Sequence, residues 1–348
     1  MRIIVLGFTG YLGGHITGQL RALGGVRLFG GGRSPAADPR GGGGGRPRPG
    51  GGGGGGRAPA PPPPPAPPPP PPPGRLAEVL ADFAPDAVVN CAGAVGGDSV
   101  KLAEVNARGP AVLCAALREA APGARLVHLG SAAEYGPTEH GVRVTETAPA
   151  APLAPYGATK LAGTLTVASS GLDAVVLRVG NPVGPGAPPT SLPGGTAERI
   201  LKAGDDPGAV VRFGDLSAYR DFVDVRDLAR AVALAATVKG PLPRVLNVSG
   251  GQAVPIRDLV HGLMTEAGFR GRAEEAAAPG SSRSVGVGWQ CSDITAAYES
   301  LGWEPRHPLA DSLSALWRSV SAVSSVPPEA PDAPATSGAA RPKLDSVP

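Results

Sequence analysis

The chain opens with an apolar segment that runs directly into a glycine-rich turn. Residues 2–6 (Arg-Ile-Ile-Val-Leu) have the composition of a buried strand, and Gly7, Gly10 and Gly13 are spaced along the next turn, before a helical pattern begins. Glycines let the backbone turn sharply close to a pyrophosphate, and a helix N-terminus offers amide donors and a favourable dipole. Because the spacing differs from that of the standard dinucleotide fingerprint, the segment predicts either a phosphate-binding turn or an ordinary glycine-rich connection.

Strand and helix patterns alternate from residue 1 to about residue 180. This alternation predicts an α/β fold in which a doubly wound parallel sheet binds its ligand at the carboxyl ends of the strands. After residue 180 the pattern becomes irregular and rich in proline. We therefore expect a Rossmann domain over 1–180 and a smaller, mainly substrate-binding domain over 181–323. The Pro-, Ala- and Ser-rich tail, 324–348, is expected to be disordered.

Residues 36–74 form a low-complexity insert within the first expected domain. Runs of glycine at 41–45 and 50–56 are followed by an almost unbroken run of proline to Pro73. Such a composition cannot bury a core, so we expect disorder, with polyproline II in the proline run. An RNA-binding arginine–glycine tract and an SH3-type ligand are weaker interpretations, since no aromatic residue is interleaved for base stacking. A reading-frame slip in GC-rich DNA would encode the same homopolymers, and peptide mass mapping that recovers the glycine and proline peptides would exclude it.

Tyr156 and Lys160 lie four residues apart in a segment with a helical pattern. Residues at this spacing project from one helix face. A free tyrosine titrates at about pH 10, so it exchanges protons poorly at neutral pH unless a neighbouring cation favours the phenolate. The pair suits proton transfer, although the same spacing also arises by chance on exposed helices.

The apolar run 126–130 ends in a small hydroxyl residue, Ser131, which precedes Tyr156 by 25 positions. Active sites of open α/β sheets lie at such strand ends. In Ser131, Tyr156 and Lys160 together, the chain resembles the extended short-chain dehydrogenase/reductase family, which contains nucleotide-sugar epimerases, dehydratases and ketoreductases. The resemblance covers roughly residues 1–32 and 75–320 and includes the segments 90–93, 105–107, 177–184, 219–229, 292–297 and 301–305.

The resemblance implies roles for the three residues. Ser131 would hydrogen-bond the reacting oxygen, Tyr156 would exchange its proton, and Lys160 would hold the nicotinamide ribose while lowering the tyrosine pKa. It also implies a bound NAD or NADP. The residues that would contact this cofactor, besides Tyr156 and Lys160, are Gly7, Thr9, Gly10, Tyr11, Leu12, Gly13, Asn90 and Ala92.

The choice between NAD and NADP depends on the end of the second strand, expected over 26–29. Arg33 comes after it and favours NADP, because an arginine accommodates a 2′-phosphate, whereas a solvated loop arginine is the alternative. In relatives, the stretch occupied here by 36–74 supplies a helix, the third strand and an acidic residue that contacts the adenine. No equivalent is present in the sequence, which puts adenine recognition in question.

The resemblance also implies a nucleotide-sugar substrate whose diphosphate contacts Asn181 and Arg220, with Arg283 as a further candidate. A guanidinium suits a pyrophosphate through its fork of donors. The alternative for Arg220 is an ion pair with Asp224 or Asp227.

Reaction type depends on the residues after Ser131. Relatives that eliminate water carry two acids directly after this position, where the chain has Ala132 and Ala133. Glu134 comes one step later and, by strand alternation, would face elsewhere. We therefore expect a 4-ketoreductase or a 4-epimerase that transfers hydride at C4, and disfavour a 4,6-dehydratase. The alternative is a non-catalytic nucleotide sensor or scaffold, or an allele impaired by the insert.

Composition adds limits. The net charge is +3, and the arginines that carry most of the positive charge are interspersed with acids. Because no concentrated basic patch is indicated, no nucleic-acid partner is expected. Cys91, Cys114 and Cys291 are widely spaced, and neither they nor the five histidines have metal-site spacing. No apolar stretch reaches the length of a membrane span and no signal peptide is recognised, so a cytoplasmic protein is expected. A homodimer is expected from the resemblance alone, through the helices after Asp98 and around Tyr156.

Overall fold

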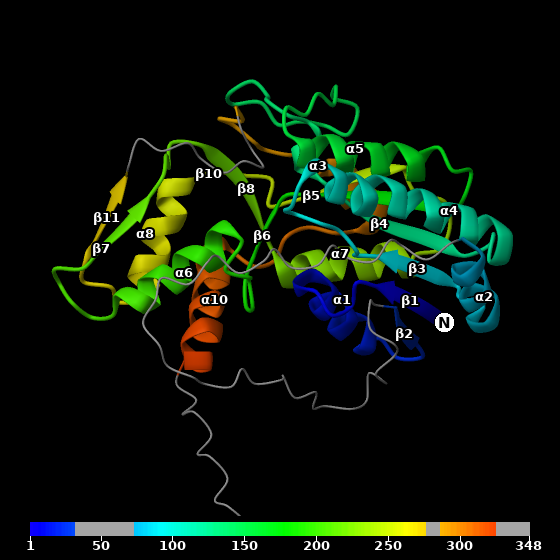
Figure 1. The fold of residues 1–348 in the computed structure, drawn as a ribbon, viewed down its shortest axis with the longest axis horizontal. Helices are drawn as coiled ribbons and strands as arrows, with labels where there is room; N and C mark the ends of the chain where they lie inside the picture. The colour runs from blue at the N-terminus through cyan, green and yellow to red at the C-terminus, as the bar shows by residue number, and fades with distance from the viewer. Residues whose placement is uncertain (32–72, 276–285, 325–348) are drawn as a thin grey trace, which may run out of the picture.

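The computed structural model describes residues 1–31, 73–275 and 286–324 (Figure 1). Most of the insert, the C-terminal tail after Ser324, Arg33 and Arg283 lie outside these ranges, so the expectations for them are not addressed by the structure. The last two residues of the insert, Pro73 and Gly74, belong to helix α2 (Pro73–Phe83). A proline suits this position because the N–H groups of the first helical turn have no acceptor within the helix, so the N–H that proline lacks costs no hydrogen bond.

The main sheet is parallel throughout, with six strands among the described residues in the order β2-β1-β3-β4-β5-β9. The strands are β1 (Arg2–Leu6), β2 (Arg27–Gly31), β3 (Ala87–Asn90), β4 (Arg125–Ser131), β5 (Ala174–Val179) and β9 (Val245–Val248). The order reverses between β1 and β3, which makes this the topological switch point. The α/β Rossmann fold predicted from the sequence is confirmed.

Helices cover both faces of this sheet (Figure 1). Alternate residues of a strand belong to two different hydrophobic cores: Ile3 and Val5 pack in one, and Ile4 packs in the other. The first core lies under α1 (Tyr11–Arg21) and α7 (Val225–Thr237), and the second lies under α2, α4 (Gly109–Ala120) and α5 (Pro155–Ala168). This alternation follows from the two-residue period of a strand and fixes which face each helix covers.

One helical stretch leads from the switch point to α4. Asp98 caps α3 (Ser99–Ala103) by accepting a hydrogen bond from the backbone N–H of Lys101. A π-helical turn over Glu104–Arg108 then joins α3 to α4. Such turns often mark functional sites, because the extra residue redirects the side chains around it.

A smaller lobe lies beside the sheet, at the left of Figure 1. Its core contains Val183, Phe222, Leu259 and Leu316, all buried. Its elements are β6 (Asn181–Val183), α6 (Leu192–Ala203), β7 (Val210–Phe213), β8 (Tyr219–Asp224), β10 (Ala253–Pro255), α8 (Ile256–Glu266), β11 (Arg272–Glu275) and α10 (Leu309–Ser324). The chain returns to the main sheet through α7, β9 and α9 (Thr295–Leu301), whose Ala297 and Leu301 join the first core.

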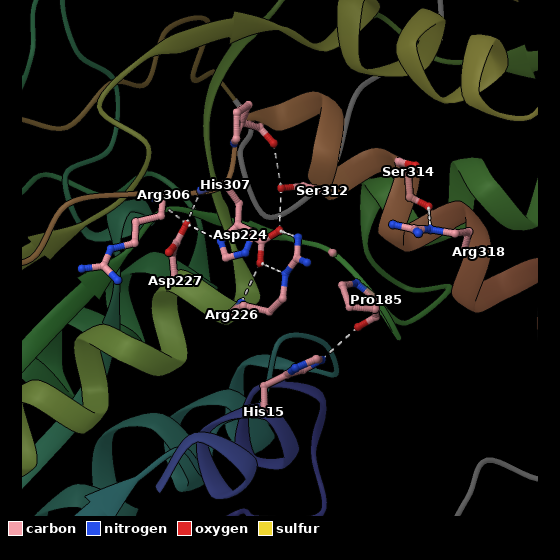
Figure 2. Close-up of polar contacts among 12 residues, drawn as sticks. His15, Pro185, Asp224, Arg226, Asp227, Arg306, His307, Ser312, Ser314 and Arg318 are labelled. Carbon is pink, nitrogen blue, oxygen red and sulfur yellow. Dashed lines mark hydrogen bonds and ion pairs between the residues drawn. The ribbon is translucent and has the colours of Figure 1, made fainter. Parts of the chain in front are cut away.

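Two aspartates at the start of α7 connect the lobes (Figure 2). Asp224 caps α7, pairs with Arg226 at 2.7 Å and accepts a hydrogen bond from Ser312 of α10 at 2.6 Å. Asp227 accepts the backbone N–H groups of Arg306 and His307, both at 2.8 Å. The carboxylates of the 219–229 segment thus hold the C-terminal part of the chain against α7.

Candidate active site

The residues expected to act together lie at the carboxyl ends of neighbouring parallel strands. Gly7 follows β1, Asn90 ends β3, Ser131 ends β4, and Asn181 begins β6, two residues after the end of β5. Because these strands are adjacent around the switch point, their carboxyl ends lie along one edge of the sheet. Open α/β sheets bind their ligands in a crevice at this edge.

The glycine-rich turn is shaped for close backbone approach. Gly7 has φ +78°, and a Cβ there would lie 2.9 Å from the amide nitrogen of Ala92. A Cβ at Gly13 would lie 2.1 Å from the carbonyl oxygen of Gly7. Gly10 is the N-cap of α1 and supplies no side chain to cap it. The first amides of α1 therefore remain available to a phosphate, and the turn fits the pyrophosphate of a dinucleotide.

The other turn residues differ in what their side chains do. Thr9 is exposed in the turn. The Tyr11 ring points toward the smaller lobe, where its hydroxyl donates to the carbonyl of Gly184 at 3.4 Å, and burial raises the pKa of this phenol. Leu12 packs on the first core. Only the backbone of Tyr11 and Leu12 can serve a phosphate here.

At the end of β3, the Asn90 side chain holds the next turn of the chain. Its Oδ1 accepts the N–H of Ala92 at 3.1 Å, and its amide nitrogen lies 3.1 Å from Nδ1 of His128. Burial, and to a smaller extent Lys160, lower the pKa of His128, which is expected to stay neutral. Asn90 thus fixes the chain directly after β3, where Ala92 is exposed.

Strand β2 is longer than the sequence indicated, because its ladder with β1 continues through Gly30 and Gly31. A Cβ at Gly30 would lie 2.7 Å from the ring of Phe8, so this glycine makes room for the aromatic side chain of the turn. Within the described part of the chain, the sheet ends at β2.

Helix α5 lies unusually close to the elements beneath it. A Cβ at Gly157 would lie 2.4 Å from the carbonyl oxygen of Ala133, and one at Gly163 would lie 2.2 Å from that of Asn106. These two contacts hold the helix face with Tyr156 and Lys160 against the end of β4 and the π-helical turn. Tyr156 is partly exposed on this face.

The Lys160 ammonium group is buried. It donates a hydrogen bond to the carbonyl oxygen of Leu129 at 2.5 Å, two residues before Ser131 on β4. Burial lowers the pKa of Lys160, and the negative charge of Glu134 opposes this effect. Burial also raises the pKa of the Cys91 thiol to about 12, so this cysteine stays protonated beside the lysine.

Ser131 ends β4 with its side chain fixed. Its oxygen accepts the N–H of Ala133 at 3.2 Å, which leaves the hydroxyl hydrogen as a donor. The chain then forms a 3₁₀ turn over Ala132–Glu134 instead of continuing as a strand. The strand conformation assumed for Glu134 was therefore wrong. The expectation that Glu134 faces elsewhere nevertheless agrees with the geometry, since its side chain folds back and is fully buried.

Asn106 was not singled out as a site residue from the sequence. It lies in the π-helical turn, accepts the N–H of Ala94 at 2.9 Å and donates to the carbonyl of Ala94 at 2.9 Å. It also donates to the Thr159 hydroxyl at 3.2 Å, next to Lys160 on α5. A buried asparagine thus joins the loop after β3 to the helix with the Tyr–Lys pair.

The expected substrate residues lie on two strands that pair with each other, Asn181 on β6 and Arg220 on β8. Arg220 on β8 is 6 % exposed and donates to its neighbour's carbonyl, that of Tyr219, at 2.7 Å. The alternative of an ion pair with Asp224 or Asp227 is not found, because those carboxylates bind Arg226, Arg230 and His307. Among the described residues, the Arg220 guanidinium has no acidic partner.

Asn181 donates to the carbonyl of Asp221 at 3.1 Å and to Oε1 of Gln290 at 2.7 Å. Its amide is thus engaged with the smaller lobe in this state. The part of the chain that the structure describes contains no cluster of histidine, cysteine and acidic side chains able to hold a metal ion, and no helix that could cross a bilayer.

Comparison with known proteins identifies the family. Residues 71–249 match the model of the NAD dependent epimerase/dehydratase family. The chain belongs to this family. The match begins after the glycine-rich turn and includes the Ser131, Tyr156 and Lys160 segments.

Named relatives cover several reactions. The chain is 39 % identical over 240 residues to a dTDP-6-deoxy-L-talose 4-dehydrogenase (NAD(P)(+)) of Kitasatospora kifunensis, covering 67 % of this chain and 74 % of the relative. It is 32 % identical over 198 residues to a dTDP-glucose 4,6-dehydratase of Streptomyces griseus, covering 55 % of this chain and 57 % of the relative. Members of the family include NAD(P)-dependent epimerases, reductases and dehydratases of nucleotide sugars.

Solved structures share the fold. A UDP-glucose 4-epimerase of Thermus thermophilus in complex with NAD aligns over 92 % of this chain and 98 % of its own, with a TM-score of 0.71 and 24 % identity. RMD of Pseudomonas aeruginosa complexed with NADPH aligns over 92 % of this chain and 99 % of its own, with a TM-score of 0.70 and 22 % identity. The expected nicotinamide cofactor is confirmed for the family, with both NAD and NADPH bound by neighbours.

Proposed function

We propose that this protein transfers hydride between NAD(P) and C4 of a nucleotide-linked deoxysugar, as a 4-ketoreductase or a 4-epimerase. The observation that supports the proposal is the packing of α5 on β4: Lys160 donates to the carbonyl of Leu129, two residues before Ser131, and Gly157, next to Tyr156, lies against the backbone of Ala133. The named relative with 39 % identity, a 4-dehydrogenase, supports a reaction at this carbon.

In this proposal the Ser131 hydroxyl donates to the C4 oxygen, since its own oxygen already accepts the Ala133 N–H. Tyr156 exchanges the proton of that oxygen, and the buried Lys160 ammonium favours the phenolate by its charge. NAD(P), which the glycine-rich turn would hold, would supply the chemistry of accepting or donating the hydride. The glycine-rich turn holds the pyrophosphate through the amides at the start of α1.

Dehydration is disfavoured by the three residues after Ser131. Ala132 and Ala133 provide no acid, and the carboxylate of Glu134 is fully buried and bound to Arg178 at 2.9 Å. A carboxylate in this position cannot remove a proton from C5 of a sugar in the crevice. The proposal therefore separates this chain from the dehydratases among its relatives.

An assay with several substrates tests the proposal. Purified protein is incubated with NAD⁺ or NADP⁺ and dTDP-6-deoxy-L-talose deuterated at C4, and the products are followed by mass spectrometry. We expect deuterium in the reduced nicotinamide for a dehydrogenase, or retained at C4 of the epimer for an epimerase. Conversion of dTDP-glucose into a 4-keto-6-deoxy product would contradict the exclusion of dehydration, and no turnover of any dTDP- or UDP-linked sugar would favour the non-catalytic alternative.

Arg220 is the residue that we expect to bind the diphosphate. Charge-assisted hydrogen bonds contribute about 2 kcal/mol, so Arg220→Met should raise KM roughly 30-fold with little change in kcat. The unliganded variant should be at least as stable as the parent, because it no longer buries a cation that has no acidic partner in the described chain. Arg212→Met, at an exposed position on β7, is the control for kinetics. A KM that stays within threefold of the parent would remove Arg220 from the substrate site.

The division into a cofactor-binding and a substrate-binding domain remains part of the proposal. A homodimer is also proposed. Val100 on α3 and Leu165 on α5 are 72 % and 59 % exposed, on the side of the sheet where α3–α5 lie. Such side chains on neighbouring helices suit burial against a second copy. Sedimentation analysis at micromolar concentration tests this, and a monomer at all concentrations would exclude it.

A further inference from the structure

Glu134 occupies the centre of a buried polar cluster that the proposed mechanism does not use. It is 0 % exposed, and its ion-pair partner Arg178 on β5 is 5 % exposed. Taking two charges out of water is costly, and a buried pair is often no more stable than apolar residues of the same size. The contacts of this carboxylate therefore need an explanation other than stability.

The first oxygen of the carboxylate binds two elements of the candidate site. Oε1 accepts the backbone N–H of Ser131 at 2.7 Å and the hydroxyl of Thr164 at 2.9 Å. Ser131 ends β4, whereas Thr164 lies on α5, four residues after Lys160 and eight after Tyr156. Because these spacings place the three α5 residues on one helix face, Oε1 anchors the face that carries the Tyr–Lys pair.

The second oxygen fixes the carboxylate itself. Oε2 accepts from Nε of Arg178 at 2.9 Å, and Arg178 also donates to the carbonyl of Glu146 at 3.3 Å. The Arg178 guanidinium lies 4.5 Å from the ring centroid of Tyr135, whose hydroxyl donates to Asn247 at 2.7 Å. Arg178 is held from several sides, so it can orient Glu134 rigidly.

The absence of a side chain at Gly130 leaves room for the Glu134 carboxylate. A Cβ at Gly130 would lie 2.7 Å from Oε1 of Glu134 and 3.1 Å from the Thr164 hydroxyl. A glycine before the serine and a glutamate after it are thus two parts of one arrangement, in which the carboxylate reaches both β4 and α5.

We propose that Glu134 is a positioning residue that sets the separation between the Ser131 hydroxyl and the Tyr156–Lys160 pair. This inference rests on the proposed function for its kinetic consequence. Donors to the C4 oxygen must come from both sides at hydrogen-bond distance, and a displacement of about 1 Å can cost 100-fold in rate. Glu134 achieves this by accepting from Ser131 and Thr164 with a single oxygen.

Two double variants separate positioning from charge pairing. Glu134→Gln/Arg178→Met and Glu134→Leu/Arg178→Met both remove the ion pair, but only the first keeps an oxygen that accepts from Ser131 and Thr164. We expect the glutamine variant to retain kcat within threefold of the parent and the leucine variant to lose 10- to 100-fold in kcat, with KM and cofactor affinity unchanged in both. Thermal unfolding of both variants checks that they fold.

A measurement independent of activity accompanies the kinetics. Hydrogen exchange should be faster in segments 129–136 and 156–166 of the leucine variant, and unchanged there in the glutamine variant. Equal kcat values or equal exchange in the two variants would overturn the role of Glu134. If the parent protein turns over no nucleotide sugar, the proposed function fails, whereas the exchange comparison still decides whether Glu134 holds the two elements together.

Discussion

Tyr156→Phe is expected to lower kcat/KM by about 100- to 10,000-fold, the range that general acid–base groups contribute. The substitution removes one hydroxyl from a partly exposed position on α5, so the fold should persist. Lys160 keeps its hydrogen bond to Leu129, and the glycine-rich turn is unaffected. Affinity for NAD(P) should therefore change by less than threefold, as measured by a fluorescence titration of the nicotinamide.

Tyr298→Phe is the matched control for this change. Tyr298 lies on α9 and is 58 % exposed, and its hydroxyl has no place in the proposed chemistry. This variant should behave as the parent in turnover and in cofactor binding. A Tyr156→Phe enzyme with a tenth or more of the parent activity would refute the proton-transfer role, and preserved cellular function without turnover would favour a sensor or scaffold.

The fold was predictable from the sequence because its signals are local. An apolar run, a glycine-rich turn and a helical pattern occur within the first 21 residues, and they form β1, the turn and α1. Tyr156 and Lys160 share one helix and Ser131 ends one strand, and the family resemblance implied that the three act together. Parallel alternation then placed these ends on one edge of the sheet.

Asn106 and Glu134 escaped prediction because their partners are far away in the sequence or depend on an unforeseen turn. Asn106 bonds Ala94 and Thr159, which lie 12 and 53 positions from it, and the π-helical turn that directs it has no sequence signature in the chain. Glu134 bonds Thr164 and Arg178, 30 and 44 positions away. The only signal available in the sequence was an acid, Glu134, three residues after the expected serine, together with Gly130 directly before that serine.

For Arg220 the sequence suggested contacts that the structure does not contain. The sequence offered two nearby carboxylates as partners, yet Asp224 caps α7 and Asp227 holds the backbone of Arg306 and His307 (Figure 2). Proximity in sequence overestimates such pairs because the chain is an extended strand from Tyr219 to Asp224, so residues four apart in it are far apart in space, and α7 begins at Val225. That this guanidinium has no acidic partner in the described part of the chain became visible only in three dimensions.

Gly13→Ala is expected to weaken cofactor binding by at least about 100-fold and to lower the free energy of unfolding by about 3 kcal/mol, the upper part of the range for overpacking. The added methyl would lie 2.1 Å from the oxygen of Gly7, 2.8 Å from its carbonyl carbon and 2.8 Å from Cα of Phe8. All three atoms belong to the backbone, so no side-chain rotation relieves the contact.

The only relief is for α1 to move away from the turn. Gly7 also accepts the N–H of Gly10 at 3.0 Å, so this movement breaks the hydrogen bond that closes the turn. It also withdraws the first amides of α1 from the pyrophosphate, and charge-assisted bonds to a phosphate depend steeply on distance. Loss of stability and loss of cofactor affinity should therefore appear together.

Gly18→Ala in the same helix separates this effect from a general change in α1. Gly18 is exposed, and a Cβ there would meet no atom of the described chain within 4 Å. Alanine is favoured over glycine by up to about 1 kcal/mol in a helix, so this variant should unfold at a higher temperature and bind NAD(P) as the parent does. If Gly13→Ala bound the cofactor with parental affinity, the amides of α1 could not be the pyrophosphate site, and the cofactor would have to be held by other parts of the crevice.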